Sequence, residues 1–161
     1  MTGPELQSLR DLLEAINDVS VGVGEARDLM GDVPASIEEM RNFSVIQRTA
    51  SRAFLKGIEQ LQDLLARAIR LVLILEQEDI TGLSARALAD RAESIGLIGS
   101  SDSWSALVKL RNQLVHEYPL SKAQQLRRLR DAWSAHIALY AVVAAISEFL
   151  RENGYPDGTA E

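Results

Sequence analysis

Residues 129–150, LRDAWSAHIALYAVVAAISEFL, contain the pattern that decides the fold. Mostly apolar side chains recur here in steps of three and four residues, which places them along one face of an α-helix. A helix with such a regular stripe is expected to bury the stripe against other helices. The stripe consists of Leu129, Ala132, His136, Leu139, Val143, Ile146 and Leu150.

The rest of the chain predicts further helices, so we expect an all-α fold, an antiparallel bundle of about five helices. Aromatic residues make up only 5%, and the apolar set is mostly Leu, Ala, Ile and Val. A capping box from Ser36 to Glu39 starts the second helix, and Pro119 ends the fourth. The expected helices cover residues 5–19, 37–77, 84–95, 103–118 and 122–152, with the glycines at 22 and 24 interrupting the first before residues 25–30 resume it.

The length of 161 residues suits one helical domain over residues 1–152. Residues 1–35 form an acidic N-terminal region of that domain, and residues 153–161 are predicted to be a disordered tail. No cysteine is present, which excludes disulfides and thiolate-based zinc sites. No apolar run approaches the roughly 20 residues that span a bilayer, and no secretory leader is visible. We therefore expect a cytoplasmic protein without a membrane partner.

Charge is distributed unevenly along the chain, whose formal net charge is −6. Residues 1–40 hold 9 acidic and 2 basic residues, whereas residues 122–130 hold four basic residues and no acidic one. A local basic cluster matters more for a phosphate ligand than the net charge does. The cluster is therefore a candidate RNA-binding surface, although a solvated helix face would have the same composition. Its members are Lys122, Arg127, Arg128 and Arg130.

Most sequence patterns for cofactor or metal binding are absent. Gly22 and Gly24 resemble the start of a dinucleotide-binding loop, but Arg27 stands where that loop requires glycine. No phosphate-binding P-loop pattern occurs. The two histidines, His116 and His136, lie twenty residues apart and have no metal-ligand spacing. We therefore predict no metal and no cofactor.

The segment Arg111-Asn112-Gln113-Leu114-Val115-His116-Glu117-Tyr118 gathers side chains that can act on a phosphate. On a continuous helix, Arg111 and Tyr118 share a face, and Asn112 shares a neighbouring face with His116. Arg111 and His116 diverge by about 140° and lie about 7.5 Å apart along the axis. Two copies of the helix crossing at a dimer interface would bring such a pair together.

These residue types suit metal-independent RNA cleavage. A histidine titrates near neutral pH, so it can take the proton of a 2′-hydroxyl or protonate a leaving oxygen. An arginine can hold a phosphate with two hydrogen bonds and stabilise its developing charge. Asn112 is a supporting residue that can orient the imidazole of His116 or contact RNA. The alternative is purely structural, because a histidine also suits the carboxyl end of a helix.

Arg111, His116 and Tyr118 reproduce the Arg-x4-His-x-Tyr motif of HEPN-domain toxins, and the chain resembles the HepT-like branch of that family. Leu97-Ile98 followed by a polar turn and Trp104 resembles the approach to the motif, and Tyr118-Pro119 resembles its exit. The long second helix with its two phenylalanines and the terminal helix also fit. The resemblance covers about residues 36–152.

The resemblance implies a ribonuclease toxin that forms a homodimer through the motif helix, with Arg111 and His116 as catalytic residues acting on RNA. It also implies a cognate antitoxin, a minimal nucleotidyltransferase that transfers AMP to Tyr118 and thereby silences the toxin. A charged nucleotide near the phosphate site would repel RNA. One alternative is the same fold without catalysis, as a docking subunit of a nucleotidyltransferase. The other is an unrelated helical interaction protein.

Overall fold

The computed structural model describes residues 3–156, and these residues form six helices without a strand. The all-α prediction is confirmed, and the number of helices is six rather than five. The helices are α1 (Gly3–Met30), α2 (Ile37–Arg41), α3 (Val45–Leu75), α4 (Ala85–Ser94), α5 (Ser101–His116) and α6 (Lys122–Glu152).

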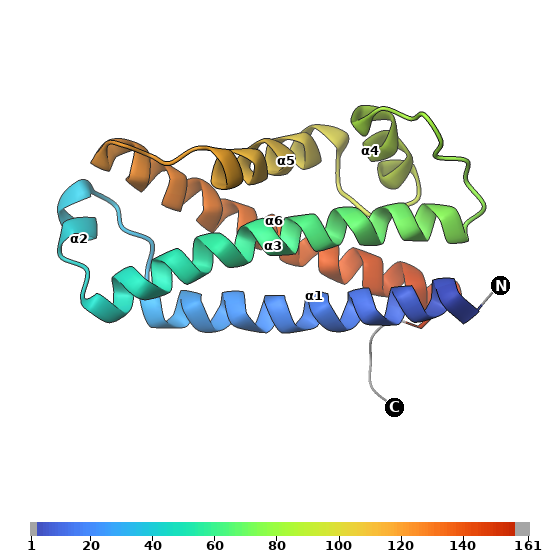
Figure 1. The fold of residues 1–161 in the computed structure, drawn as a ribbon, viewed down its shortest axis with the longest axis horizontal. Coiled ribbons are helices and arrows are strands. Elements are labelled where there is room, and N and C mark those ends of the chain that lie inside the picture. Colours follow the sequence, from blue (N-terminus) through green and yellow to red (C-terminus); the bar gives the residue numbers. More distant parts are fainter. Residues whose placement is uncertain (1–2, 157–161) are drawn as a thin grey trace.

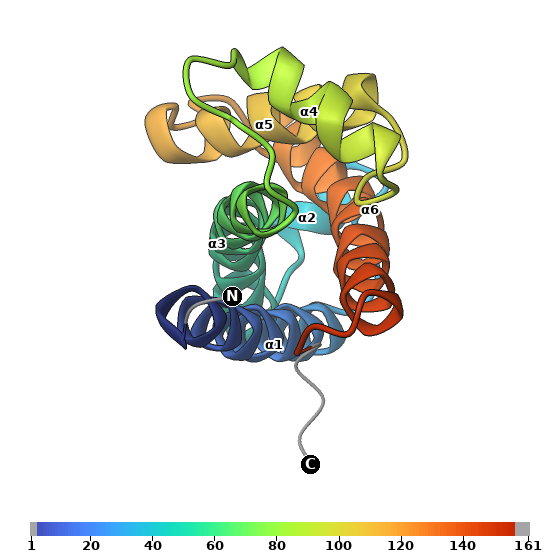
Figure 2. The same ribbon diagram turned by 90° about the vertical axis from the view of Figure 1, so that its right-hand side faces the viewer.

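The long helices α1 and α3 run side by side in opposite directions, and α6 lies along their other side (Figure 1). Viewed from the end, α1, α3 and α6 form three sides of the bundle, and α5 with α4 closes the fourth (Figure 2). The core lies between these four sides. The short helix α2 and the loop between α5 and α6 meet at the same end of the molecule.

Helix α1 is continuous, so the predicted interruption at Gly22 and Gly24 is wrong. The cause is tertiary packing: Val23, between the two glycines, is 1% exposed and lies against Gly57 of α3. A Cβ atom at Gly57 would lie only 2.6 Å from Cγ2 of Val23. The gain from burying this close helix–helix contact exceeds the modest helix penalty of the glycines.

The segment predicted as one helix over residues 37–77 is two helices, α2 and α3. The break is local: Asn42 ends α2, and the side chain of Ser44 begins α3 by accepting a hydrogen bond from the backbone N–H of Gln47 at 3.1 Å. The Gln47 side chain accepts from the Ser44 N–H in return, which completes a capping box. Phe43, between the two caps, is buried and fastens the turn to the core.

His136 is a core residue of α6 and not a surface ligand. It is 4% exposed and makes edge-to-face contacts with Phe54, Trp133 and Tyr140. Burial lowers its pKa below the ordinary value, against the opposing effect of its hydrogen bond with the backbone of Trp133. The Tyr140 hydroxyl donates to the carbonyl of Ser20 at 2.9 Å and so ties α6 to α1. This aromatic cluster joins α1, α3 and α6 in the middle of the bundle.

The predicted disordered tail over residues 153–161 is wrong in its first part. The Tyr155 hydroxyl lies 2.8 Å from Oε1 of Glu76 and 3.3 Å from the carbonyl oxygen of Leu75. Its ring packs against the core. The polar and glycine residues around Tyr155 in the sequence give no sign of this contact. Residues 157–161 of that prediction lie outside the described residues.

Among the described helices, only α6 is long and apolar enough to cross a membrane, by length and composition alone. The same test is passed by helices that form protein cores, and α6 packs against α3 through its buried stripe. Only 33% of its most apolar window is buried inside the chain. Within residues 3–156, part of the apolar surface of α6 is therefore uncovered, including Ile137, which is 61% exposed.

Candidate functional site

Helix α5 carries the motif and is held at both ends. Ser100 caps its first turn, and Trp104, Leu107 and Leu110 bury its inner face in the core. It ends at His116 because the next residue, Glu117, has extended backbone angles. The ring of Pro119 also disfavours helical angles at Tyr118, the residue directly before it. The candidate residues therefore lie on the last two turns of α5 and in the loop that follows.

Arg111 points from α5 toward α3. Its Nη2 atom lies 3.3 Å from Oδ1 of Asp63, and its Nη1 atom lies 3.3 Å from Oδ1 of Asn112. The Nε atom of Arg111 is buried and has no hydrogen-bond partner among the described residues. Asp63 also pairs with Arg67 at 3.4 Å. The guanidinium is therefore held by α3, with donor capacity left unused.

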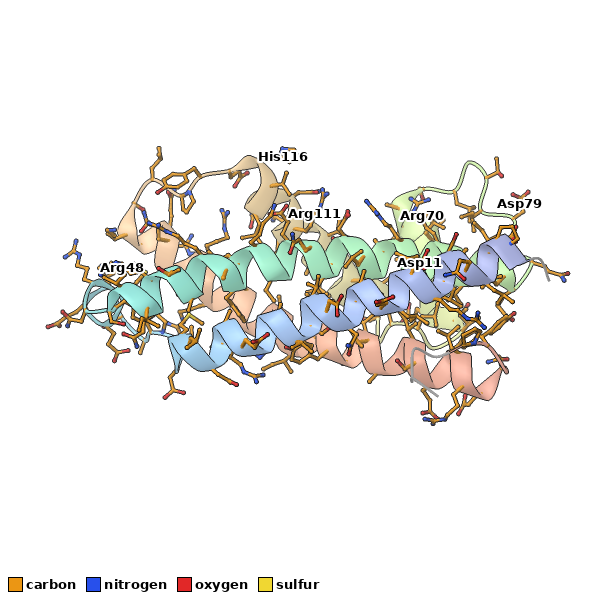
Figure 3. The ribbon with its side chains drawn as sticks, turned by 60° about the horizontal axis from the view of Figure 1, so that its bottom comes forward. Asp11, Arg48, Arg70, Asp79, Arg111 and His116 are labelled. Atoms are coloured by element: carbon orange, nitrogen blue, oxygen red, sulfur yellow. The ribbon has the colours of Figure 1, made fainter. Side chains whose placement is uncertain are left out.

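His116 and Asn112 lie on the outer side of the same helix, and both are exposed. With Lys109 they line a hollow of about 390 Å³ along α5. Figure 3 shows His116 at the surface, away from the contact between Arg111 and α3. Within one chain the structure therefore does not bring Arg111 and His116 together, as the helical spacing predicts.

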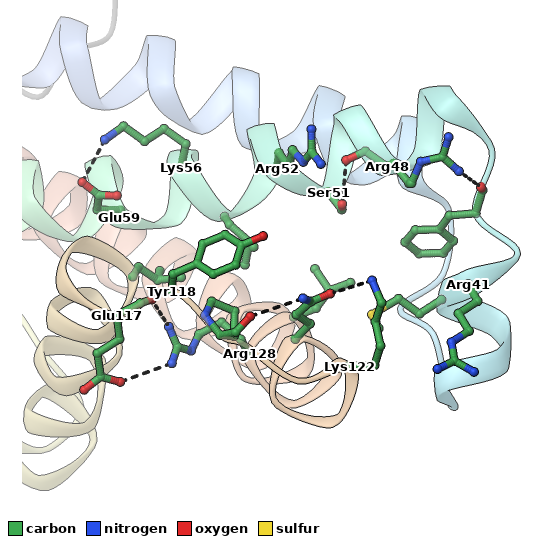
Figure 4. A pocket seen from close by; sticks show the side chains of 17 residues that line it. Arg41, Arg48, Ser51, Arg52, Lys56, Glu59, Glu117, Tyr118, Lys122 and Arg128 are labelled. Atoms are coloured by element: carbon green, nitrogen blue, oxygen red, sulfur yellow. Dashed lines mark hydrogen bonds and ion pairs between the residues drawn. The ribbon is translucent and has the colours of Figure 1, made fainter.

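Tyr118 does not share a face with Arg111, so that part of the sequence prediction is wrong. The prediction assumed a helix through residue 118, but α5 ends two residues earlier. Tyr118 is 80% exposed and stands at the edge of a different site, a pocket between α3 and the α5–α6 loop (Figure 4). Arg111 does not line this pocket.

The pocket beside Tyr118 has a volume of about 490 Å³ and combines apolar and basic walls. Helices α2 and α3 form one side, and the end of α5 with the start of α6 forms the other (Figure 4). Its apolar lining residues are Met40, Phe43, Leu55, Leu114, Pro119 and Leu129. Its basic lining residues are Arg41, Arg48, Arg52, Lys56, Lys122 and Arg128, against the acidic Glu59 and Glu117.

The four basic residues predicted to bind RNA do not form one surface. Lys122 and Arg128 line the pocket, whereas Arg127 and Arg130 are exposed elsewhere on α6. The Arg128 side chain is only 12% exposed, and its Nη1 atom donates to the carbonyls of Gln113 at 3.1 Å and Glu117 at 3.3 Å. Arg128 thus satisfies carbonyls at the end of α5, which is a structural role.

The sequence analysis missed Asp63 and the basic residues of α3. Arg48, Arg52 and Lys56 lie four residues apart, so they form one ridge on the helix. That spacing is visible in the sequence, but it does not show that α2 and the α5–α6 loop complete a pocket beside the ridge. The pairing of Asp63 with Arg111, 48 residues apart, requires the tertiary structure.

Among residues 3–156, no three histidine, aspartate or glutamate side chains are grouped as metal ligands would be. The chain matches no protein-family model, no curated protein and no solved structure. The family resemblance therefore rests on the motif and its surroundings alone.

Proposed function

We propose that this protein is a metal-independent endoribonuclease, the toxin of a toxin–antitoxin pair, with a HEPN-like fold. The observation that carries the proposal is the placement of the motif: an exposed imidazole with Asn112 one turn before it, on the same helix as an arginine. The Arg111 side chain is 31% exposed, and each of its Nη atoms makes one contact and has a second N–H. A core histidine such as His136 could not reach a substrate. His116 can.

In the proposed reaction, the imidazole of His116 accepts the proton of an RNA 2′-hydroxyl. The 2′-oxygen forms a bond to phosphorus while the bond from phosphorus to the 5′-oxygen breaks. The imidazolium of His116 formed in this step returns a proton to the leaving 5′-oxygen. The products are a 2′,3′-cyclic phosphate and a 5′-hydroxyl. Arg111 binds the phosphate and stabilises the charge that develops on it.

A homodimer is part of the proposal, because Arg111 and His116 diverge within one chain. Two features support a second copy. Helix α6 leaves apolar residues uncovered, including Ile137. Beside them lies an almost wholly apolar hollow of about 340 Å³, walled by Trp104 and Leu107 of α5 and by alanines of α6. Homodimer interfaces are typically built from such apolar surfaces.

The proposed partner is a minimal nucleotidyltransferase antitoxin that transfers AMP to Tyr118, and the proposed location is the cytoplasm. The supporting observation is exposure, since the Tyr118 side chain is 80% exposed on a loop. The second candidate function is a non-catalytic docking subunit of such an enzyme. The same exposed tyrosine favours it, and RNA cleavage separates the two candidates.

Complementation between two inactive variants tests the proposal. Arg111→Ala and His116→Ala should each abolish RNA cleavage in the presence of EDTA. A heterodimer of the two variants retains one intact site if Arg111 of one chain works with His116 of the other. Co-refolded in equal amounts, the mixture should recover about a quarter of the wild-type rate, because about half of randomly formed dimers are mixed.

Two controls make the complementation decisive. Each variant alone must keep its helical circular dichroism and its dimeric mass, so that inactivity reflects lost chemistry. Arg10→Ala, an exposed arginine of α1, should cleave RNA at near the wild-type rate. Folded, unmodified wild-type protein that cuts no RNA would rule out the ribonuclease and leave the docking subunit. An active wild type with no recovery in the mixture would rule out the shared site.

A further inference from the structure

A ridge of basic side chains runs along one side of the pocket next to Tyr118. Arg48, Arg52 and Lys56 lie on α3 at intervals of four residues, which corresponds to about 6 Å between neighbours along the helix axis. All three side chains line the same pocket and are visible along α3 in Figure 4. A linear series of cations suits a ligand with a linear series of negative charges.

The cations of this pocket are only partly neutralised. Lys56 pairs with Glu59 at 2.9 Å, and Arg128 pairs with Glu117 at 3.4 Å. Arg48 donates one hydrogen bond to the carbonyl of Phe43 and keeps its charge unpaired. Within the described part of the chain, Arg41, Arg52 and Lys122 have no carboxylate partner either. Four unpaired cations therefore surround one cavity, although the whole chain carries a net charge of −6.

The remaining surface of the pocket suits flat, weakly polar rings. Leu55 and Leu114 are half-buried in its wall, and the ring of Tyr118 stands 80% exposed at its edge. An exposed aromatic side chain beside a cationic groove is the arrangement on which bases of single-stranded nucleic acids stack. A volume of about 490 Å³ is enough for a small ligand or a short strand segment, and too small for a folded partner.

We propose that this pocket binds a single-stranded RNA segment of two or three nucleotides, with phosphates along Arg48 and Arg52 and a base on Tyr118. The inference rests on the proposed ribonuclease function in one respect: that function is the reason for taking RNA as the nucleic acid that binds. It adds a binding groove separate from the cleavage residues, since neither Arg111 nor His116 lines the pocket. The groove would hold RNA flanking the scissile phosphate.

The experiment measures binding without cleavage. The probe is a fluorescein-labelled hexanucleotide of 2′-O-methyl RNA, which has no free 2′-hydroxyl and cannot be cut. Fluorescence anisotropy should show that Arg52→Ala weakens binding about tenfold. The slope of log affinity against log salt should fall by about 0.7 when one phosphate contact is lost. The matched control is Arg70→Ala, an exposed arginine of α3 that does not line the pocket.

A second pair of variants tests stacking at Tyr118. Tyr118→Ala should weaken binding at least about fivefold, whereas Tyr118→Phe should bind as the wild type does. Circular dichroism must show that every variant keeps its helical content. A charge-matched polyglutamate peptide should not compete for the groove, because it has no rings to stack.

The proposal is overturned if the wild type does not bind the hexanucleotide, or if Arg52→Ala and Arg70→Ala bind it equally. It is also overturned if AMP or polyglutamate binds while the hexanucleotide does not. The proposed function and the groove fail independently. Binding that depends on Arg52 without any RNA cleavage would remove the ribonuclease and keep the groove. RNA cleavage by the wild type, with hexanucleotide binding unaffected by Arg52→Ala, would remove the groove and keep the ribonuclease.

Discussion

The Nη2 atom of Arg111 lies 3.3 Å from Oδ1 of Asp63, so the motif arginine of α5 is tied to the middle of α3. Both side chains are partly exposed, at 31% and 39%. A partly exposed pair contributes little to stability, on the order of 1 kcal/mol or less. The contact therefore acts mainly on Arg111 itself: it fixes the position of the guanidinium and supplies a carboxylate that competes with any phosphate.

Replacing Asp63 by asparagine tests that competition. Asp63→Asn keeps the shape of the side chain and removes the negative charge. If Arg111 binds the phosphate of RNA, the KM for RNA should fall in Asp63→Asn, because the phosphate no longer displaces a carboxylate. The free energy of unfolding should change by less than about 1 kcal/mol. Steady-state cleavage kinetics and urea unfolding give the two numbers.

The control for this variant is Arg67→Ala, since Arg67 also pairs with Asp63. The KM should not fall in this variant, because the Asp63 carboxylate that competes with the phosphate is still present. A KM that is unchanged or higher in Asp63→Asn would contradict the competition and leave Asp63 as a purely positioning partner.

The contact between Gly57 and Val23 determines how closely α1 and α3 pack. Gly57→Ala would place a Cβ atom 2.6 Å from Cγ2 of Val23, so the helices must separate. We expect a loss of about 1–2 kcal/mol in unfolding free energy, since overpacking outweighs the gain in helix propensity. Gly22→Ala is the matched control, because nothing lies within 4 Å of its Cβ position, and it should stabilise by about 0.5–1 kcal/mol.

A double variant separates overpacking from other causes. In Gly57→Ala combined with Val23→Ala, the clash is removed, so the double variant should lose less stability than the sum of the two single variants. Additive losses would show that Gly57 and Val23 do not press on each other.

The free energy of unfolding should decrease as the pH is lowered below about 6.5, because His136 is buried as a neutral base. Burial lowers its pKa in the folded state, so the unfolded chain binds the proton first as the pH falls. The contribution is complete above the unfolded pKa and is lost progressively below it, by up to about 1.4 kcal/mol per pH unit. Urea unfolding at pH 7.5 and 5.5 should show a smaller loss in His136→Leu than in the wild type.

The range above the unfolded pKa provides the internal control. Between pH 7.5 and 8.5, the difference in stability between wild type and His136→Leu should stay constant. If the difference in stability between wild type and His136→Leu is the same at pH 5.5 and 7.5, His136 becomes protonated in the folded core without a loss of stability.

Arg128 should behave as a structural residue and Arg127 as a surface residue, although the sequence groups them. Arg128→Met removes the charged hydrogen bonds to the carbonyls of Gln113 and Glu117, so we expect a loss of about 1–2 kcal/mol. Hydrogen exchange should quicken in the last turn of α5. Arg127→Met should change stability by less than about 0.5 kcal/mol. Equal effects of the two substitutions would refute the distinction.

The sequence predicts the elements well where the information is local. The stripe of α6 and the starts of α4 and α6 near residues 84 and 122 follow from local patterns, and Ser84 and Ser121 cap these helices in the structure. The turn at residues 42–44 also uses local signals, but a periodic apolar pattern on both sides masked it. The continuity of α1 depends on Gly57, more than thirty residues away, so no local pattern could reveal it.

The sequence singles out Arg111, His116 and Tyr118, but it does not show which other residues surround them. Spacing alone separates Arg111 from His116, because both lie on one helix. The position of Tyr118 depends on where that helix ends, and an error of two residues moves the side chain to another site. The basic pocket combines residues from α2, α3, α5 and α6, so only the packing of those helices could assemble it.

Tyr118→Phe tests the proposed regulation without disturbing the fold. The side chain is 80% exposed, so losing the hydroxyl should change stability by less than about 0.5 kcal/mol. RNA cleavage should persist, since the ring remains. Incubation with the proposed antitoxin and ATP should add the mass of AMP to the wild type and to Tyr155→Phe, but not to Tyr118→Phe. If the protein is the proposed toxin, expression of Tyr118→Phe should then arrest growth even with the proposed antitoxin present. A mass gain that persists in Tyr118→Phe would place the modification elsewhere, and neutralisation without any mass gain would show that binding alone silences the toxin.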